Sequence, residues 1–387
     1  MRIVIVGGGI MGASAAWWLT RGPTPPAIAV IERDPSLAQS ATMLSAASIR
    51  MQFTLAENVR MSQFGWQFLS DAQATLGEDV GLRTRGYLVL ASDAGAQTLR
   101  DSVAMQNAEG AATALLDPAA VTRRFPWISA EGVALAALGE TEGWFDPAGF
   151  HRGLKRGAQA AGAIWHAGTA TVFVHTAGRL SGVELIGADG TPQVLPADLI
   201  INAAGPRGGE VAGWAGVDLP VRPDIRTVVR LTAPESQAIC AESPLIFDTS
   251  GVWMRPEGSG FISGAPSPVQ PDDPWDLTPD WPLFEDTIWP SLAARIPTFE
   301  RLRMAGAWAG PYDWNAVDQN GLIGFHPGCD ALFHICGFSG HGLQHAPAAG
   351  RALAELVLTG RFQTLDLSAL AADRLALGRE MHELAVI

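Results

Sequence analysis

The first twelve residues place the tightest constraint on how this chain can fold. Residues 3–6 form an apolar, β-branched run, which is typical of a buried parallel strand. Three glycines follow in the spacing Gly7-x-Gly9-x-x-Gly12, and the Ala-rich run 13–19 then predicts a helix. In such a unit Gly7 permits a tight turn, Gly9 lets the backbone approach a ligand, and Gly12 lets the helix pack on the strand. The helix would offer its unpaired N–H groups and its positive dipole end to an anion.

A second strand, predicted at residues 27–31, ends at Glu32. A carboxylate at this position can accept hydrogen bonds from both ribose hydroxyls of an adenosine. The glycine motif alone is a weak indication, because Gly-rich turns are common. Strand, glycines, helix, strand and terminal acid in this order predict a bound dinucleotide.

The bulk composition bounds the class of protein. A chain of 387 residues is long enough for two domains and a large core, and its 48% hydrophobic and 17% charged content is typical of a globular protein. The formal net charge of −13 argues against nucleic acid as a partner, since nucleic acid requires a basic face. Lys155 is the only lysine.

Cysteines and targeting signals add little. The three cysteines, Cys240, Cys329 and Cys336, are odd in number and form no CxxC pair, so we expect neither a disulfide framework nor a metal site. We interpret the apolar N-terminal run as strand and helix rather than as a signal peptide. No segment reaches transmembrane length without a break, and we expect a cytoplasmic protein.

The elements expected for a dinucleotide-binding unit occur at the beginning, middle and end of the chain, with antiparallel patterns between them. Residues 198–203 and 332–336 read as further buried strands, whereas 221–264 alternates as an antiparallel sheet does. We therefore predict an α/β fold in which a Rossmann-like domain with a parallel sheet is discontinuous in sequence and carries an inserted, mostly antiparallel α+β domain. The predicted limits are 1–83, 146–215 and 318–387 for the first domain, and 84–145 and 216–317 for the second.

Several helices and loops are predicted from local signals. Asp146 as an N-cap and Pro147 in the first turn predict a helix over 148–161. Apolar residues at helical spacing predict another over 57–76. Further helices are expected at 94–109, 283–295 and 343–359, and loops at 117–127 and 266–282.

Four blocks of the sequence resemble the FAD-dependent amine oxidoreductases of the D-amino-acid oxidase superfamily, which includes sarcosine oxidase, glycine oxidase and dimethylglycine dehydrogenase. The most specific block is Gly337-Phe-Ser-Gly-His-Gly342 before a helix. The run Asp-Gln-Asn-Gly at 318–321 resembles a less characterised bacterial branch, related to mitochondrial FAD-dependent oxidoreductase-domain proteins. The resemblance covers nearly the whole chain, through residues 3–12 with Glu32, 40–50, 198–206, and 308–324 with 337–342.

The resemblance implies a parallel sheet that binds FAD and an antiparallel sheet that covers the flavin. It also implies oxidation of an amine, an amino acid or N-alkyl amino acid, to an imine by hydride transfer to flavin N5. The electron acceptor stays open between O2, a quinone and an electron-transfer protein. The cofactor-binding residues implied are Gly7, Gly9, Ile10, Met11 and Gly12; Glu32 and Arg33; Ser40, Thr42, Ser45, Ala46 and Ala47; Thr171 and Val172; Ala203, Ala204 and Gly205; and Gly337, Phe338, Ser339, Gly340, His341, Gly342, Leu343 and Gln344.

The chain departs from the family pattern at positions that affect the chemistry. Gly310 and Pro311 precede Tyr312, where some sarcosine oxidases carry a cysteine bonded to the flavin, so we expect noncovalent FAD. The strand at 260–264 lacks the lysine that those oxidases use with O2, and Gln344 stands where they bind the substrate carboxylate with a lysine. A dehydrogenase and an oxidase therefore both remain open.

Two arginines compete for the role of carboxylate partner. Arg50 follows the small-residue loop, and Arg255 lies on a predicted strand of the covering sheet; either could bind a carboxylate in bidentate fashion, and Arg50 could also be a surface residue. His341, between two glycines, is expected to contact flavin or substrate. Tyr312 and Trp253 either line the pocket or belong to the aromatic core.

His345 is expected on the surface of the last helix or as a cap. Two other functions remain possible from the sequence. One is a flavin-bound assembly or scaffold protein without turnover of its own. The other is a nicotinamide-dependent dehydrogenase, which would leave the Gly337–Gly342 block unexplained.

Overall fold

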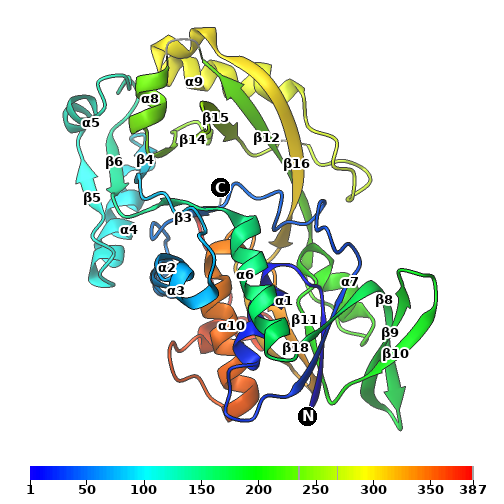
Figure 1. Ribbon diagram of the computed structural model, residues 1–387. Helices are drawn as coiled ribbons and strands as arrows, with labels where there is room; N and C mark the ends of the chain where they lie inside the picture. The colour runs from blue at the N-terminus through cyan, green and yellow to red at the C-terminus, as the bar shows by residue number, and fades with distance from the viewer. Residues whose placement is uncertain (234–235, 268, 386–387) are drawn as a thin grey trace.

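The computed structural model describes residues 1–233, 236–267 and 269–385, and contains two eight-stranded sheets (Figure 1). In the first sheet five neighbouring strands, from β8 to β18, run parallel, and antiparallel strands extend it on both sides. Its strands in spatial order are β10 (Pro192–Pro196), β9 (Arg179–Gly187), β8 (Ile164–Thr176), β2 (Ala27–Glu32), β1 (Arg2–Val6), β11 (Leu199–Asn202), β18 (Cys329–Cys336) and β17 (Leu322–His326).

The second sheet is antiparallel except for the parallel pair β13 and β4. The predicted α/β class, with one parallel and one mostly antiparallel sheet, is confirmed. All strands of this sheet fall within 84–145 and 216–317, while the exact domain limits remain a prediction. In spatial order they are β16 (Arg303–Asn315), β12 (Val221–Thr232), β15 (Gly260–Gly264), β14 (Trp253–Glu257), β13 (Leu245–Phe247), β4 (Tyr87–Ala91), β6 (Leu135–Gly139) and β5 (Ala114–Leu116).

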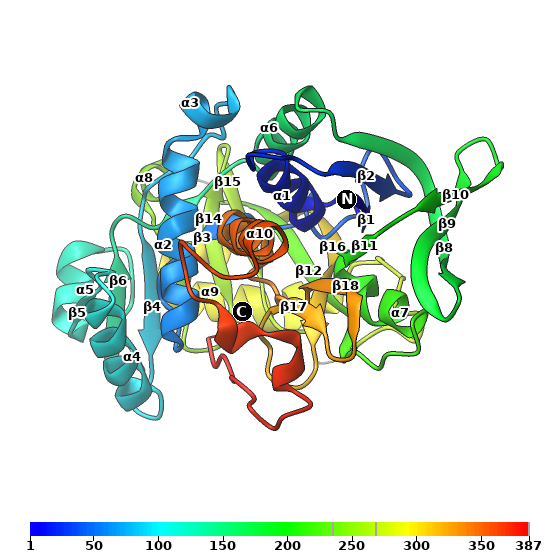
Figure 2. The ribbon, with the colours of Figure 1, turned by 90° about the horizontal axis from the view of Figure 1, so that it is seen from below.

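Helices α1 (Ile10–Leu19), α10 (Gly342–Thr359), α6 (Pro147–Ala160) and α2 (Ala56–Ser70) pack together on one face of the first sheet, as Figure 2 shows for α1, α10 and α6. The first and last of the predicted helices are thus neighbours. Ser14 of α1 donates a hydrogen bond to the carbonyl of Ala346 in α10, at 2.6 Å. The remaining α-helices described are α3 (Ala72–Leu76), α4 (Ala96–Ala108), α5 (Pro118–Arg124), α7 (Gly208–Gly213), α8 (Gln237–Glu242) and α9 (Trp289–Arg295).

Some local predictions were wrong. Residues 118–124, expected as a loop, form α5, which Asp117 caps by accepting a hydrogen bond from Ala120 N at 2.6 Å. The helix expected over 57–76 divides at Asp71 into α2 and α3. The helix expected over 283–295 is present, but its segment Phe284–Ile288 is π-helical and precedes α9. Pro290 supplies no N–H for an α-helical hydrogen bond at that point.

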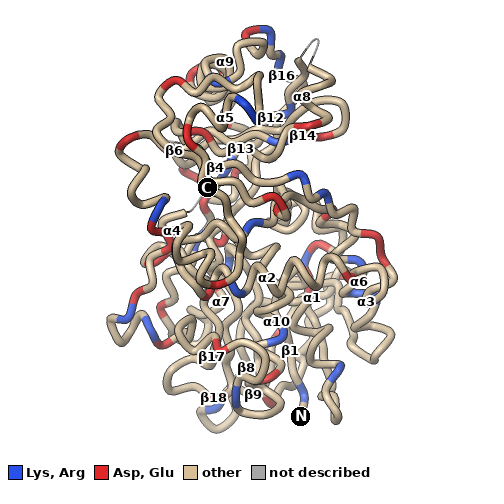
Figure 3. The backbone as a smooth tube through the Cα atoms, turned by 90° about the vertical axis from the view of Figure 1, so that its left-hand side faces the viewer, with Lys and Arg blue, Asp and Glu red and all other residues tan. Residues whose placement is uncertain are grey.

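A two-stranded ribbon, β3 (Ser48–Ile49) with β7 (Gly143–Trp144), lies between the two sheets. Figure 3 shows basic positions scattered among acidic ones along the chain. Across residues 1–233, 236–267 and 269–385 no helix is both long and apolar enough to cross a membrane.

Candidate active site

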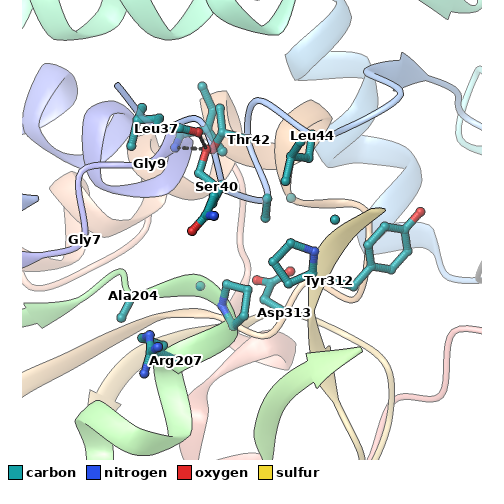
Figure 4. Close-up of a pocket in the computed structure, with 18 of the residues that line it drawn as sticks. Gly7, Gly9, Leu37, Ser40, Thr42, Leu44, Ala204, Arg207, Tyr312 and Asp313 are labelled. Carbon is teal, nitrogen blue, oxygen red and sulfur yellow. Dashed lines mark hydrogen bonds between the residues drawn. The ribbon is translucent and has the colours of Figure 1, made fainter. Parts of the chain in front are cut away.

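A cavity of about 360 Å³ lies between the two sheets, at the carboxyl ends of β1, β2 and β11 (Figure 4). The loop 37–46 forms one wall, Ala204 and Arg207 form another, and Tyr312 and Asp313 of β16 form a third. Ligands of open α/β sheets bind at this edge of the sheet. We call this space the main cavity.

The glycine motif forms the part of the main cavity next to β1. Gly7 has φ +103°, a conformation that glycine adopts without strain. A Cβ at Gly12 would lie 3.1 Å from the carbonyl carbon of Gly7 and closer still to its oxygen, so α1 packs directly on the turn. The N-cap of α1 is Gly9, which has no side chain to accept hydrogen bonds from the first turn of the helix. Of the N–H groups in that turn, Ile10 N donates to Thr42 Oγ1, at 3.0 Å. The first turn therefore presents backbone N–H groups toward the cavity, as a diphosphate requires.

Glu32 is fixed at the end of β2 and lines the main cavity. Its Oε2 accepts from Gly8 N at 2.8 Å, and its Oε1 accepts from Asp34 N at 2.9 Å. A carboxylate has about four lone-pair sites, so two remain for ribose hydroxyls. Arg33, the next residue, also lines the cavity.

Most of the other residues predicted to bind the cofactor line the main cavity, but some do not. Ala47, Gly337 and Phe338 are buried behind the loops that do. Thr171 and Val172 are exposed, and the cavity is lined by Gly168, Thr169 and Ala170 instead, just before a bulge in β8. Those in the wall are Gly7, Gly9, Ile10, Met11, Glu32, Arg33, Ser40, Thr42, Ser45, Ala46, Ala203, Ala204, Gly205, Gly340, Gly342 and Leu343.

Asp313 is a buried carboxylate in the wall of the main cavity that the sequence analysis did not single out. Its Oδ2 accepts a hydrogen bond from Phe338 N at 3.0 Å, and its carbonyl accepts from Ser339 N at 3.0 Å. Asp313 thereby fixes the loop that leads into α10. Burial raises the pKa of Asp313 to about 6.

A second, small cavity of about 40 Å³ adjoins the main one and shares Ala46, Trp253, Tyr312 and Gly340 with it. Tyr312 and Trp253 thus line the pocket and are not merely aromatic core. The two tyrosines of the chain, Tyr87 and Tyr312, both lie in its wall. The other lining residues are Ser48, Arg50, Leu245, Ser339, His341 and Gln344.

Arg50 lies in the wall of the small cavity and is 3% exposed. Its guanidinium donates to the main-chain carbonyls of Gln52 and Ala385, and its Cζ lies 4.1 Å from the centroid of the Phe53 ring. No carboxylate of the described residues lies within ion-pair distance of it. A buried cation that no carboxylate of residues 1–233, 236–267 and 269–385 pairs with can bind an anionic ligand favourably.

Arg255 lines neither cavity. Its Nε and Nη2 donate to the carbonyl of Ala46 at 3.0 and 2.9 Å, and its Nη1 is paired with Glu257. Arg255 therefore ties the covering sheet to the loop above the cavities. Of the two candidate arginines, only Arg50 is placed where a ligand can reach it.

His341 lines the small cavity and is 3% exposed, and neither of its ring nitrogens has a hydrogen-bond partner among the described residues. Burial, with Arg50 nearby, holds the pKa of His341 well below its usual range, so the ring is neutral. His345, expected on the helix surface, is instead fully buried, with Nε2 3.0 Å from Ser62 Oγ. The Pro347-containing part of α10 packs against α2 and leaves no surface there.

Glu142 binds the two residues that follow Arg50 and was not predicted from the sequence. This buried carboxylate accepts from Met51 N at 2.7 Å and from Gln52 Nε2 at 2.8 Å. Burial raises its pKa to about 7. No local pattern marks Glu142, whereas the rarity of tyrosine in this chain could have drawn attention to Tyr87.

The cysteine and the lysine that some sarcosine oxidases use have no counterpart among the described residues that line the two cavities. None of the three cysteines, all of which are described, lines either cavity. Lys155 lies on α6 with its Nζ 5.8 Å from the Trp165 ring centroid, and is not a lining residue either. The residues present fit a noncovalently held dinucleotide.

Comparison with known proteins supports this arrangement. The family model described as FAD dependent oxidoreductase matches residues 2–356. The chain is 38% identical, over its whole length and 87% of the relative, to FAD-dependent oxidoreductase domain-containing protein 1 of Bos taurus. It is 25% identical to glycine oxidase of Bacillus licheniformis, with 96% of each chain covered. The crystal structure of L-proline dehydrogenase from P. horikoshii superposes with a TM-score of 0.87 at 24% identity, covering 98% of this chain and 99% of that one.

Proposed function

The chain belongs to the FAD dependent oxidoreductase family, with FAD as its cofactor, and from this premise we propose that it oxidises the C–N bond of a small amino acid or N-alkyl amino acid. The observation that carries the proposal is that Arg50, a buried cation, lines the small cavity that adjoins the main cavity. The sequence-related glycine oxidase lends the amine chemistry further support.

FAD, when bound, supplies the acceptor for a hydride. The first turn of α1 would hold its diphosphate and Glu32 its ribose, and the positive end of α10 would face charge that develops on the ring upon reduction. Trp253 and Tyr312 belong to the walls of both cavities. The contribution of the protein is therefore to position the cofactor and the substrate and to exclude water from them.

Arg50 is proposed to bind the substrate carboxylate. An arginine held in place by main-chain carbonyls keeps its remaining N–H groups in a fixed fork, which suits a planar carboxylate. The hydroxyl-bearing rings of Tyr87 and Tyr312 lie in the same wall and can donate to the same group. Binding the carboxylate at this point orients the adjoining carbon toward the main cavity.

His341 is proposed to receive a hydrogen bond from the substrate amine. Its ring is neutral and its nitrogens have no partner in the described part of the chain, so its unprotonated nitrogen can accept a hydrogen bond. The substrate is proposed to bind as the neutral amine, whose neighbouring carbon can release a hydride as the C–N bond becomes an imine. The cavity of about 40 Å³ favours a substrate no larger than a small amino acid.

The absence of lysine from the lining residues supports a dehydrogenase that delivers electrons to an acceptor other than O2. Oxygen consumption and dye reduction, measured with the same substrate, distinguish the two activities. A faster reaction with O2 than with the dye would contradict this part of the proposal.

The proposal is tested by anaerobic addition of small amino acids and N-alkyl amino acids to the yellow holoprotein. We expect at least one of these compounds to bleach the flavin absorbance of the wild type. Arg50→Met should require a much higher concentration of the same compound, since a lost buried charge contact costs roughly 2–5 kcal/mol. Arg124→Met, which changes an exposed arginine outside both cavities, serves as the control. A protein that binds FAD but is reduced by no member of the panel would favour the scaffold function instead.

A further inference from the structure

A tryptophan of the second domain reaches over the main cavity to two arginines of the first. Trp275 belongs to the loop at 269–280, which lies between β15 and α9. Its indole ring is half-buried and lines the main cavity together with Arg33 and Arg207. The sequence analysis assigned no role to Trp275 or Arg207.

The loop is fastened at two points to β12. On one side Gln270 Oε1 accepts from Ile225 N at 2.6 Å, and its Nε2 donates to the Ile225 carbonyl at 3.2 Å. On the other side Asp280 N donates to Thr227 Oγ1 at 2.9 Å. Trp275 is therefore held between two anchors on the covering sheet.

The two arginines come from the opposite domain. Arg33 follows β2 and Arg207 ends the 3₁₀ turn Gly205–Arg207 after β11, the two strands that flank β1. The guanidinium carbon of Arg207 lies 3.7 Å from the Trp275 ring centroid, and that of Arg33 lies 5.8 Å from it. Trp275 thus brings this loop of the covering sheet to the two arginines in the wall of the main cavity.

The arginines retain donors for a ligand. Arg207 Nε is buried and has no hydrogen-bond partner among the described residues, although the same side chain pairs with Glu210 through Nη1. Arg33 forms no ion pair with the residues that the structure describes. Arg33 and Arg207 thus place two cations in the wall of the main cavity, one of them also paired with the lining residue Glu210, where they can donate to a dianionic diphosphate.

We propose that Arg33, Trp275 and Arg207 form a clamp that binds the adenosine-diphosphate half of FAD and sets the rate at which the cofactor leaves. The Trp275 ring lies against the guanidinium of Arg207 and near that of Arg33, and these cation–π contacts hold the two side chains in the cavity wall. Release of FAD then requires the loop to lift from both arginines. The clamp concerns the cofactor alone, so it does not depend on the proposed substrate.

The test is the rate at which FAD passes from purified holoprotein into an ultrafiltrate. We expect Trp275→Ala to raise the dissociation rate constant about tenfold, which corresponds to about 1.4 kcal/mol. Trp275→Phe keeps a ring face and should stay within about threefold of the wild type. Trp281→Ala removes an exposed tryptophan that lines neither cavity and should leave the rate unchanged.

A double-mutant cycle checks that the contact itself is responsible. Arg207→Gln should also speed release, and the Trp275→Ala, Arg207→Gln pair should show less than the product of the two single effects. Should Trp275→Ala fail to fold, Trp275→Leu fills the space without a π face and carries the same expectation. The clamp would be overturned if FAD left the Trp275→Ala or Trp275→Leu variant at the wild-type rate, or if Trp281→Ala raised the rate as much as Trp275→Ala. It would also be overturned if the effects of Trp275→Ala and Arg207→Gln on the rate were independent.

Discussion

Arg374 and Asp318 form a buried ion pair whose removal should destabilise the protein strongly. Their side chains are 3% and 0% exposed, with Nε–Oδ2 at 2.7 Å and Nη2–Oδ1 at 2.9 Å. Arg374 also donates to the carbonyls of Gly321, Leu370 and Asn320 at 2.9, 2.9 and 3.0 Å. The pair therefore joins the Asp-Gln-Asn-Gly run at 318–321 to the C-terminal segment 374–385, whose residue Ala385 contacts Arg50.

The magnitude follows from what each change leaves behind. Arg374→Met leaves the Asp318 carboxylate buried without its cation, which costs about 3–5 kcal/mol of unfolding free energy. The pair Arg124–Glu140 provides a matched control, because its side chains are 63% and 70% exposed. Arg124→Met should cost no more than about 1 kcal/mol.

Urea unfolding at constant FAD concentration measures both variants. A double variant, Asp318→Asn with Arg374→Met, leaves no unpaired charge and should be more stable than Arg374→Met alone. If Arg374→Met and Arg124→Met shift the unfolding midpoint equally, or if the double variant is the least stable, the reasoning about this buried pair is refuted.

Two further predictions concern the cofactor loop and Glu142. Gly12→Ala would drive a Cβ against the Gly7 carbonyl and should cost about 1–3 kcal/mol together with weaker FAD binding, whereas Gly213→Ala, which meets no atom within 4 Å, should leave FAD titrations unchanged. Burial raises the pKa of Glu142 from 4.5 to about 7, so the folded state holds a proton that the unfolded state has lost. The unfolding free energy of the wild type should therefore fall, relative to Glu142→Gln, as pH rises through that window. Urea unfolding at about pH 5 and about pH 8 checks this, and parallel pH curves would contradict it.

Local signals explain what the sequence predicts well. The Asp146-Pro147 pair correctly placed the start of α6, with Asp146 accepting from Ala148 N and Gly149 N. The same signal at Asp117-Pro118 was passed over, because the basic and aromatic residues after it look like a loop. Within the main cavity the residues of the glycine motif were likewise predictable, since one contiguous unit builds that wall.

Contacts between distant segments explain the rest. Arg50 meets Ala385, which lies 335 residues away in the sequence, and no local pattern indicates that pairing. His345 looks like a surface residue until α2 covers that side of α10. Trp275 lies in a loop whose position depends on β12 of the second sheet.

The most direct test of the account is binding of a small carboxylic acid that cannot be oxidised, such as acetate, followed by the absorbance of bound FAD. The account predicts a saturable change in the flavin spectrum of the wild type, lost in Arg50→Met and retained in Arg124→Met. An unchanged spectrum in the wild type, or the same affinity for acetate in Arg50→Met, would contradict a carboxylate site at Arg50 beside the flavin.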